Sequence, residues 1–304
     1  MGAAGGAAWI STSQQWTPKF IRERFSEIGV AVEGAKHKPS PSKWSDRQIT
    51  ASWLGHSTVL LNFYGLTVLT DPVLFPRVGA DLGIGTLGPK RRVAAALSSR
   101  EVPFVDVALL SHAHLDHFDM PSLKTLRADT KVVTASRTAD LLSRTELARN
   151  AKELSWGEKT LVQTAHGEVE IEAFQVKHWG ARWRHDTYRG YNGYILSRAG
   201  KKIIFGGDTA LCKGFSEIRS KGPFELACMP IGAYNPWIYS HCTPEQAVRM
   251  ANDARAKYIL PIHHYTFRFG RECYTEPLER LQAALKQEPE RLALKEAGET
   301  FLVA

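Results

Sequence analysis

The sequence has little cysteine and lacks both a long apolar run and a recognisable targeting signal. Only four cysteines occur among 304 residues, and none belongs to a Cys-x-x-Cys pair. This scarcity excludes a disulfide framework or a zinc ribbon and fits a reducing compartment. No apolar run approaches the ~18 residues of a membrane-spanning helix, and the N-terminus lacks a basic segment followed by an apolar core. We therefore expect a cytoplasmic protein without a signal peptide or transmembrane span.

The composition is that of an ordinary globular protein, with 43% hydrophobic, 10% aromatic and 23% charged residues. A disordered or collagen-like chain is thereby excluded. Lysine and arginine number 39 against 31 aspartates and glutamates, a net charge of +8. This charge favours anionic partners such as phosphate esters or lipid headgroups, but it also fits a solvated basic surface. No specific nucleic-acid module is recognisable, and the oligomeric state stays open.

The patterning divides the chain into an extension and a larger domain. Residues 1–48 are expected to form an N-terminal extension whose short amphipathic helix, over residues 20–28, docks on the domain or lies on a membrane. From 49 to 304, strands alternate with helices in two comparable halves, which indicates an α/β fold with mixed sheets covered by helices. The glycine-containing segment 75–92 is expected to be a long functional loop.

The expected elements can be placed from apolar patterning and turn residues. Strands are expected over 49–72, with a turn at Tyr64-Gly65, and over 104–111, 131–136, 160–164, 168–177, 191–208, 225–231 and 257–264. Helices are expected over 121–127, 138–149 and 278–286, and one more begins after Thr243. Thr243 and Gln246 form a capping-box pattern around Pro244, which is suited to the first helical position.

The segment Ser-His-Ala-His-Leu-Asp-His, residues 111–117, follows directly on a predicted buried strand. Neutral imidazole and carboxylate are the ligand types that suit Zn²⁺ and similar metals. His112 and His114 lie two apart in extended chain and point to the same side, whereas Asp116 and His117 come after the chain turns and can face a second ion. The segment predicts a metal site, with a solvated histidine cluster as the alternative.

Other predicted strands also end in potential ligands. His178, Asp208 and His263 each close a strand, and the single carboxylate of Asp208 could bridge two ions. Asp71 is expected to accept an N–H from a ligating imidazole and so fix its tautomer. His56 either does likewise or is simply packed. Because several strand ends carry only metal-ligand residue types, we expect them to meet at one site.

Substrate contacts are expected from residues near these ligands. His241 could contact a phosphate or protonate a leaving group, or it is a surface histidine near a helix start. Six residues are expected to line the opening and to bind an anionic head with an apolar body. They are Tyr234, Asn235, Arg182, Arg184, Tyr188 and Trp237. The alternative for the arginine-rich part is a solvated basic loop.

Residues 111–117 resemble the His-x-His-x-Asp-His signature of the metallo-β-lactamase superfamily, with His178, Asp208 and His263 in matching order. The segments WLGHSTVLL, LTDPV, GPKRR, VKHW, FGGDT, PIGAYNPW, HCTPEQAV, LPIHH and EPLERL together resemble the branch of N-acylphosphatidylethanolamine-hydrolysing phospholipase D and its bacterial relatives. The resemblance implies an αββα four-layer sandwich of two mixed sheets flanked by helices. It further implies two ligand groups joined by a bridging Asp208: the first is His112, His114 and His178, and the second is Asp116, His117 and His263. A departure is His264, where the branch has tryptophan.

The expected function is a hydrolase with two divalent ions, zinc in the first instance, acting as a phosphodiesterase of phospholipase D type on lipid-like substrates. Two such ions about 3.5–4 Å apart would share a bridging water, lower its pKa towards ~7 and polarise the scissile bond, with Asp116 orienting the hydroxide. The basic end of the glycine loop, Lys90-Arg91-Arg92, would contact an anionic membrane surface. The alternatives are a lactonase or nuclease on the same fold and a non-catalytic binding protein.

Overall fold

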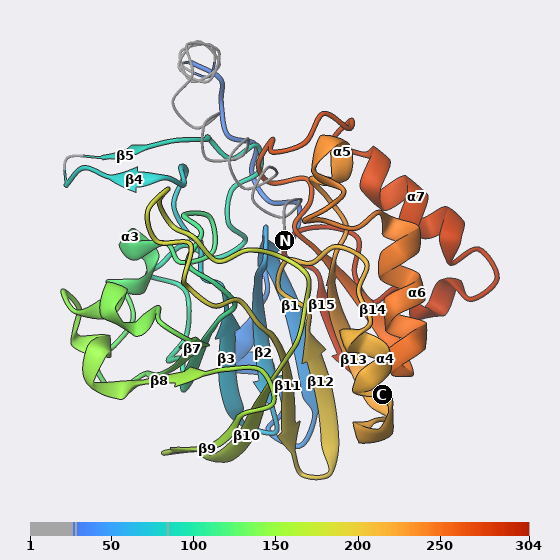
Figure 1. Ribbon diagram of the computed structural model, residues 1–304, viewed down its shortest axis with the longest axis horizontal. Coiled ribbons are helices and arrows are strands. Elements are labelled where there is room, and N and C mark those ends of the chain that lie inside the picture. Colours follow the sequence, from blue (N-terminus) through green and yellow to red (C-terminus); the bar gives the residue numbers. More distant parts are fainter. Residues whose placement is uncertain (1–26, 28, 84, 304) are drawn as a thin grey trace.

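A computed structural model describes residues 27, 29–83 and 85–303 as two mixed β-sheets flanked by helices (Figure 1). The seven-stranded sheet has the order β15 (Thr300–Val303), β1 (Ile49–Gly55), β2 (Thr58–Phe63), β3 (Leu66–Thr70), β6 (Val107–Leu110), β7 (Lys131–Ala135) and β8 (Ala151–Leu154). The six-stranded sheet has the order β14 (Ala256–Ile262), β13 (Phe224–Pro230), β12 (Lys201–Phe205), β11 (Gly193–Arg198), β10 (Gly167–Phe174) and β9 (Lys159–Thr164). The expected αββα sandwich is confirmed.

The parallel parts of the sheets position the site. In the first sheet β3, β6, β7 and β8 are parallel neighbours, and in the second β12, β13 and β14 are. The carboxyl ends of parallel strands lie at the same edge of a sheet, so the loops that follow these strands gather there. In Figure 1 this edge is the upper one, where α5 (Tyr234–Trp237) follows β13.

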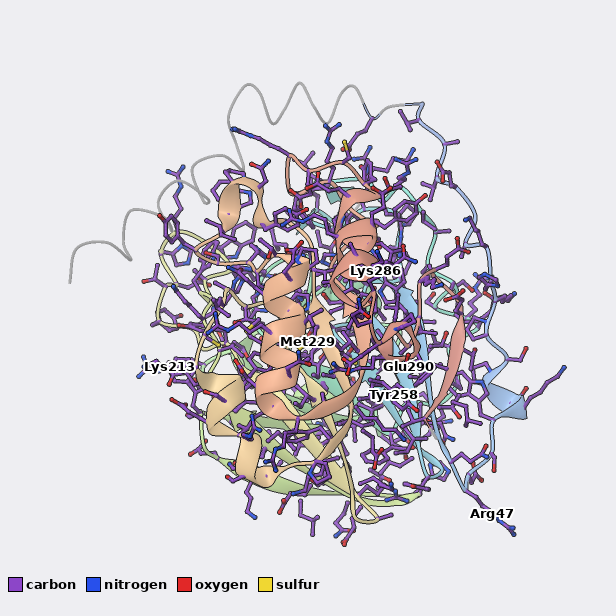
Figure 2. The ribbon with its side chains drawn as sticks, turned by 90° about the vertical axis from the view of Figure 1, so that its right-hand side faces the viewer. Arg47, Lys213, Met229, Tyr258, Lys286 and Glu290 are labelled. Carbon is purple, nitrogen blue, oxygen red and sulfur yellow. The ribbon has the colours of Figure 1, made fainter. Side chains whose placement is uncertain are left out.

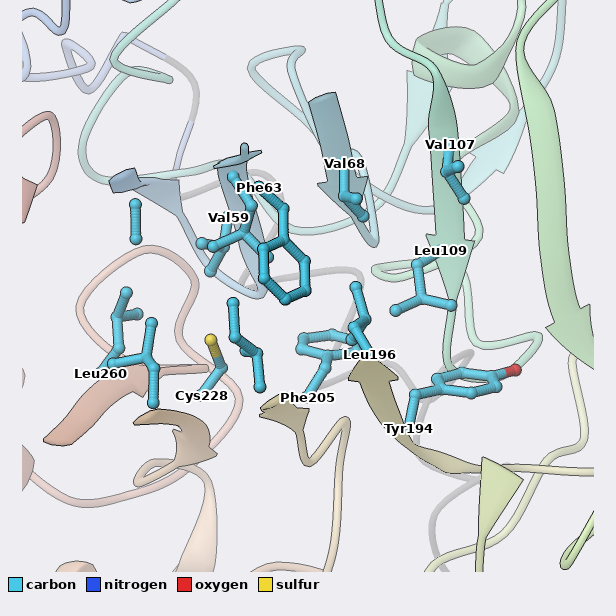
Figure 3. Close-up of a cluster of buried hydrophobic side chains, with 14 of the residues drawn as sticks. Val59, Phe63, Val68, Val107, Leu109, Tyr194, Leu196, Phe205, Cys228 and Leu260 are labelled. Carbon is cyan, nitrogen blue, oxygen red and sulfur yellow. The ribbon is translucent and has the colours of Figure 1, made fainter. Parts of the chain in front are cut away.

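The main hydrophobic core lies between the two sheets (Figure 3). Phe63 and Leu109 come from the first sheet and meet Leu196 and Phe205 from the second, and all four side chains are fully buried. Burying a side chain of this size contributes about 1.5–3 kcal/mol. The alternating apolar positions of these strands therefore hold the sheets together.

Helices cover the outer face of the six-stranded sheet (Figure 2). These are α4 (Gly214–Glu217), α6 (Pro244–Ala254) and α7 (Glu276–Ala284), and α6 lies over Met229 of β13. The expected capping box is confirmed, because Thr243 Oγ1 accepts from the Gln246 backbone N–H and the Gln246 side chain accepts from the Thr243 N–H. Among the described residues, no helix has the length and apolar character that a bilayer span requires.

On the outer face of the first sheet, the structure corrects two helix predictions. The helix expected over 138–149 is two 3₁₀ helices, η2 (Ala139–Leu142) and η3 (Glu146–Asn150), because Thr145 is extended and its hydroxyl donates to the Leu142 carbonyl. The helix expected over 121–127 is the shorter α3 (Met120–Leu123), after which the Thr125 hydroxyl donates to the Ser122 carbonyl. Side-chain hydrogen bonds of this kind compete with helix continuation.

Further differences concern strands and the glycine loop. The strand expected to reach residue 177 ends at Phe174, and the Lys177 backbone N–H turns to the Thr209 hydroxyl. The loop 75–92 carries a two-stranded hairpin, β4 (Ala80–Asp81) and β5 (Thr86–Leu87). Strands β8 and β15 were not expected. Apart from residue 27, the helix expected over 20–28 lies outside the described residues, and nothing tests it.

Candidate metal centre

Imidazoles and carboxylates from several strand ends meet at the upper edge of the sandwich. Asp71 follows β3, residues 112–117 follow β6, Asp208 follows β12 and His263 follows β14. His178 reaches the same place from the chain that leaves β10. Loops that were separate in the sequence are thus brought to one point by the parallel strand order of both sheets.

Three imidazoles form one donor group. Nε2 of His112 lies 2.7 Å from Nδ1 of His114, and Nε2 of His178 lies 3.3 Å from the same atom. The Nδ1 atom of His178 is 2.8 Å from the Ser240 carbonyl oxygen, to which it donates when protonated. That hydrogen bond leaves Nε2 of His178 as the lone-pair atom facing the other two imidazoles.

A second donor group is built around Asp116. Its Oδ2 lies 3.4 Å from Nε2 of His117, 3.6 Å from Nε2 of His263 and 2.9 Å from Nε2 of His56. The side chains of His56, His117 and His263 are almost completely buried, whereas Asp116 keeps 17% of its side-chain surface. The carboxylate is therefore the member of this group that faces the opening.

Asp208 lies between the two groups. Its Oδ2 is 3.2 Å from Nε2 of His117, 3.1 Å from Nε2 of His263 and 3.7 Å from Nε2 of His178. Nδ1 of His241 is 3.8 Å from the same oxygen. Asp208 is thus the only carboxylate within 4 Å of imidazoles from both groups among the described residues, which is the placement that a bridging ligand requires.

Several polar atoms of these side chains are buried without a hydrogen-bond partner. Nε2 of His117, Oδ1 of Asp208 and Nδ1 of His241 lie at the centre itself. For His114 and His263 the unpaired atom is the other ring nitrogen, Nε2 and Nδ1 respectively. An unpaired buried polar atom costs about 1–3 kcal/mol, so a concentration of them at one point calls for a ligand. Imidazole nitrogens and carboxylate oxygens are donors for zinc and related first-row ions. The residues present therefore fit a pair of divalent metal ions.

The electrostatics of the centre favour neutral imidazoles in the first group. Burial lowers the pKa of His112 and of His114 well below the usual value, and it lowers the pKa of His178 to about 4. Burial is the largest single influence on His263 and lowers its pKa, but the charge of Asp208 and the hydrogen bonds to Asp116 and Asp208 together outweigh it and raise the pKa of His263 to about 9. Metal binding requires deprotonated ligands, and the first group is already in that state at neutral pH.

Comparisons with known proteins agree with this geometry. Residues 67–264 match the family model of the beta-lactamase superfamily domain. The chain belongs to the metallo-β-lactamase superfamily.

An uncharacterized protein of Mycobacterium tuberculosis is 31% identical over 260 residues, covering 83% of this chain and 68% of that protein. N-acyl-phosphatidylethanolamine-hydrolyzing phospholipase D 1 of Caenorhabditis elegans is 31% identical over 252 residues, covering 78% and 70%. The fold is similar to Igni18, a metallo hydrolase of Ignicoccus hospitalis, with a TM-score of 0.62 and 20% identity over 84% of this chain and 99% of that one.

The protein is a metal-dependent hydrolase of this superfamily. Buried hydrogen-bond partners lie behind its metal donors. Oδ2 of Asp71 lies 2.7 Å from Nδ1 of His117, and the carboxylate also accepts from the Ser111 N–H and hydroxyl. The His56 carbonyl accepts from Trp53 Nε1 and from the His263 N–H. Asp71 thus lies behind a donor imidazole, at the place expected for it, whereas His56 is a buried imidazole whose ring lies beside Asp116 and whose carbonyl holds the backbone of His263.

Some residues expected to bind substrate do not face the centre of this metallo-β-lactamase fold. Arg182 is 8% exposed, and its guanidinium donates to the Ala113 and Phe118 carbonyls. Tyr234 is also buried, and its hydroxyl donates to Glu276. The expectation that both side chains are exposed at the opening is wrong, because their polar atoms donate to backbone carbonyls and a carboxylate inside the fold.

Other predicted contact residues remain accessible. Arg184, Tyr188 and Asn235 are exposed, and Trp237 is half-buried with its Nε1 donating to the Phe269 carbonyl. The basic end of the glycine loop differs from the prediction in one respect. Arg91 is 2% exposed and donates to the carbonyls of residues 73 and 93, so it is not available to a membrane.

Three aromatic residues beside the donors were missed by the sequence analysis. The Trp179 ring lies 4.2 Å from that of His114, the Phe267 ring 5.1 Å from that of His56, and the Phe269 ring 6.0 Å from that of His263. All three closely follow a predicted ligand in the sequence, which was the available signal. They give the donor cluster apolar neighbours on two sides.

Proposed function

We propose that the protein hydrolyses a phosphodiester bond in a lipid-like substrate with the help of two divalent ions, zinc in the first instance. The convergence of seven imidazole and carboxylate side chains, Asp208 among them, carries the metal-dependent part of the proposal. The phosphodiester part is supported by similarity to the Caenorhabditis elegans relative, whose name states a phospholipase D activity. Both parts can be tested separately.

The two donor groups have distinct tasks in this proposal. His112, His114 and His178 would hold one ion, and Asp116, His117 and His263 the other, with Asp208 shared. Divalent ions held in this way supply an acidic water as nucleophile and Lewis-acid polarisation of the phosphoryl oxygen. The chain itself has to hold its donors rigidly. Their burial, and the hydrogen bonds from His117 to Asp71 and from His178 to the Ser240 carbonyl, favour this.

His241 is the proposed substrate contact closest to the donors. Its ring lies 5.1 Å from the rings of His178 and His263, and its side chain is 12% exposed at the opening. Nδ1 has no hydrogen-bond partner although it is buried. Since Nδ1 faces Asp208, we place the exposed edge of this imidazole against an oxygen of the substrate phosphate, where a hydrogen bond would orient the scissile bond.

An amphiphilic substrate is favoured by apolar groups around the opening. Trp179 and Phe269 flank the donors, and the hairpin β4–β5 and α5 lie at the same end of the molecule (Figure 1). The hairpin exposes Leu82 and Leu87, and the turn after α5 exposes Tyr239 at 74%. Exposed apolar side chains around a site are typical of lipid or membrane contact. We therefore propose that the protein approaches a lipid surface with this end.

A substrate panel tests the proposal. Zinc-loaded protein is given vesicles containing N-acyl-phosphatidylethanolamine, the soluble diester bis-p-nitrophenyl phosphate, a lactone and labelled RNA. We expect hydrolysis of the P–O bond on the headgroup side, which converts N-acyl-phosphatidylethanolamine and water into phosphatidic acid and an N-acylethanolamine. Turnover there should be faster than on the soluble diester. Turnover of the lactone or the RNA alone would replace the phospholipase proposal with one of those activities.

A further inference from the structure

Arg182 is a buried cation whose position the sequence analysis did not anticipate. It belongs to the segment 179–190, which directly follows His178. Its Nη1 donates to the Ala113 carbonyl at 3.0 Å and to the Phe118 carbonyl at 2.9 Å, and its guanidinium lies 5.9 Å from the Phe118 ring centre. The two carbonyls bracket residues 114–117, which contain three of the donors. One nitrogen thus ties together both ends of the ligand loop.

The segment that carries Arg182 is itself held tightly. The carboxylate of Asp186, 1% exposed, accepts from the Trp183 N–H and from Arg189 Nε, both at 2.7 Å. A side chain on Gly180 would meet the Arg189 carbonyl oxygen at 2.2 Å, so only glycine permits this close approach. Arg182 is therefore presented from a closed, rigid loop rather than from a mobile arm.

We infer that Arg182 is a positioning residue that sets the geometry of the metal centre by clamping the ligand loop 113–118 onto the segment following His178. The clamp connects the ligand loop that follows β6 of the first sheet with the segment that follows His178 of the second. It therefore fixes the position of the two donor groups relative to each other. The inference rests on the metal centre of the proposed function. Arg182 itself is not a metal donor and acts only through the backbone carbonyls of the ligand loop.

Arg189 offers a matched control in the same segment. It is also a buried arginine, 7% exposed, and it donates to the Arg137 carbonyl at 2.6 Å and to the Asp140 carboxylate. Outside the segment 179–190 its partners lie in a loop that carries no metal donor, and its bond to Asp186 involves neither of the carbonyls that Arg182 contacts. Loss of Arg189 should therefore weaken the fold through the same kind of contact without acting on the centre.

The experiment compares zinc affinity, by competition with a chromophoric chelator, in wild type, Arg182→Met, Arg182→Lys and Arg189→Met. Loss of an outer partner of a metal ligand typically lowers affinity 10–100-fold, and we expect about that for Arg182→Met. Arg182→Lys, which keeps a donor for one or both carbonyls, should recover part of the loss. Arg189→Met should bind zinc within about twofold of wild type.

Thermal unfolding with zinc and with chelator separates positioning from general stability. If Arg182 is a positioning residue, zinc should raise the melting temperature of Arg182→Met by less than it raises that of wild type. Arg189→Met should lower the melting temperature by the same amount with zinc and with chelator. Wild-type zinc affinity in Arg182→Met, or equal losses in both methionine variants, would overturn the clamp. A wild-type protein that binds no zinc would instead overturn the proposed metal centre.

Discussion

Oδ2 of Asp71 lies 2.7 Å from Nδ1 of His117, and both side chains are completely buried. The carboxylate accepts a hydrogen bond from the N–H at Nδ1. The other ring nitrogen, Nε2, is therefore left as the lone-pair atom, and it faces Asp116 and Asp208. The strand end of β3 thereby determines the tautomer of a donor that belongs to the loop after β6. This relationship leads to the first prediction.

Asp71→Asn should lower zinc affinity about 10–100-fold, because the amide keeps the shape but loses the negative charge behind His117. Chelator competition measures the loss. The variant Asp106→Asn serves as the control, since Asp106 is likewise a buried carboxylate beside an imidazole, 2.8 Å from Nδ1 of His166, and His166 is not one of the metal donors. Unchanged affinity in Asp71→Asn would show that His117 does not depend on this carboxylate.

The hairpin at the opening should take part in lipid contact. The double variant Leu82→Asp, Leu87→Asp should reduce binding to anionic vesicles about tenfold or more, because each leucine contributes at most ~1.5–3 kcal/mol when fully buried. Vesicle sedimentation gives the affinity. Both residues are exposed, at 59% and 41%, so the fold should tolerate the change.

Leu161→Asp is the matched control for the hairpin, because Leu161 is 53% exposed on β9, at the opposite end of the sandwich in Figure 1. It should leave vesicle binding unchanged. The soluble diester should be cleaved equally by wild type, the hairpin variant and the control. An equal loss of vesicle binding in hairpin variant and control would remove the hairpin from the lipid-contact surface.

Thr243→Ala should destabilise the protein by about 1 kcal/mol, because it removes the side-chain acceptor of the α6 capping box. Urea unfolding monitored by tryptophan fluorescence measures this loss. Thr243→Ser, which keeps the hydroxyl, should stay close to wild type. Destabilisation of the serine variant by as much as the alanine variant would indicate that the methyl group, and not the cap, is the stabilising part.

The sequence was most informative where chemistry is local. Residues 112–117 follow a short buried strand, and their spacing depends on nearby backbone alone, so their convergence could be predicted. The meeting of His178, Asp208 and His263 with them was also predictable, because strand ends in α/β folds share an edge. The division into two groups around Asp208 was implied by the family resemblance, not by the spacing of the residues, and the structure adds the distances that place Asp208 between them.

Residues whose environment depends on distant contacts were harder to place. Arg182 and Tyr234 look like rim residues in the sequence, but the carbonyls and the carboxylate that bury them come from segments more than forty residues away. The start of η2 depends on a similar contact, since the Glu153 carboxylate accepts from the backbone N–H groups of residues 137–139. Tertiary partners of this kind leave no periodic pattern.

Metal content tests the central claim most directly. Wild-type protein loaded with zinc and freed of excess should contain about two ions per chain by elemental analysis, the number that two-metal sites hold. Asp208→Ala should lose both, because the carboxylate lies within 4 Å of imidazoles from both donor groups. A wild-type chain that retains no zinc or other divalent ion after loading, while folded by circular dichroism, would contradict the account.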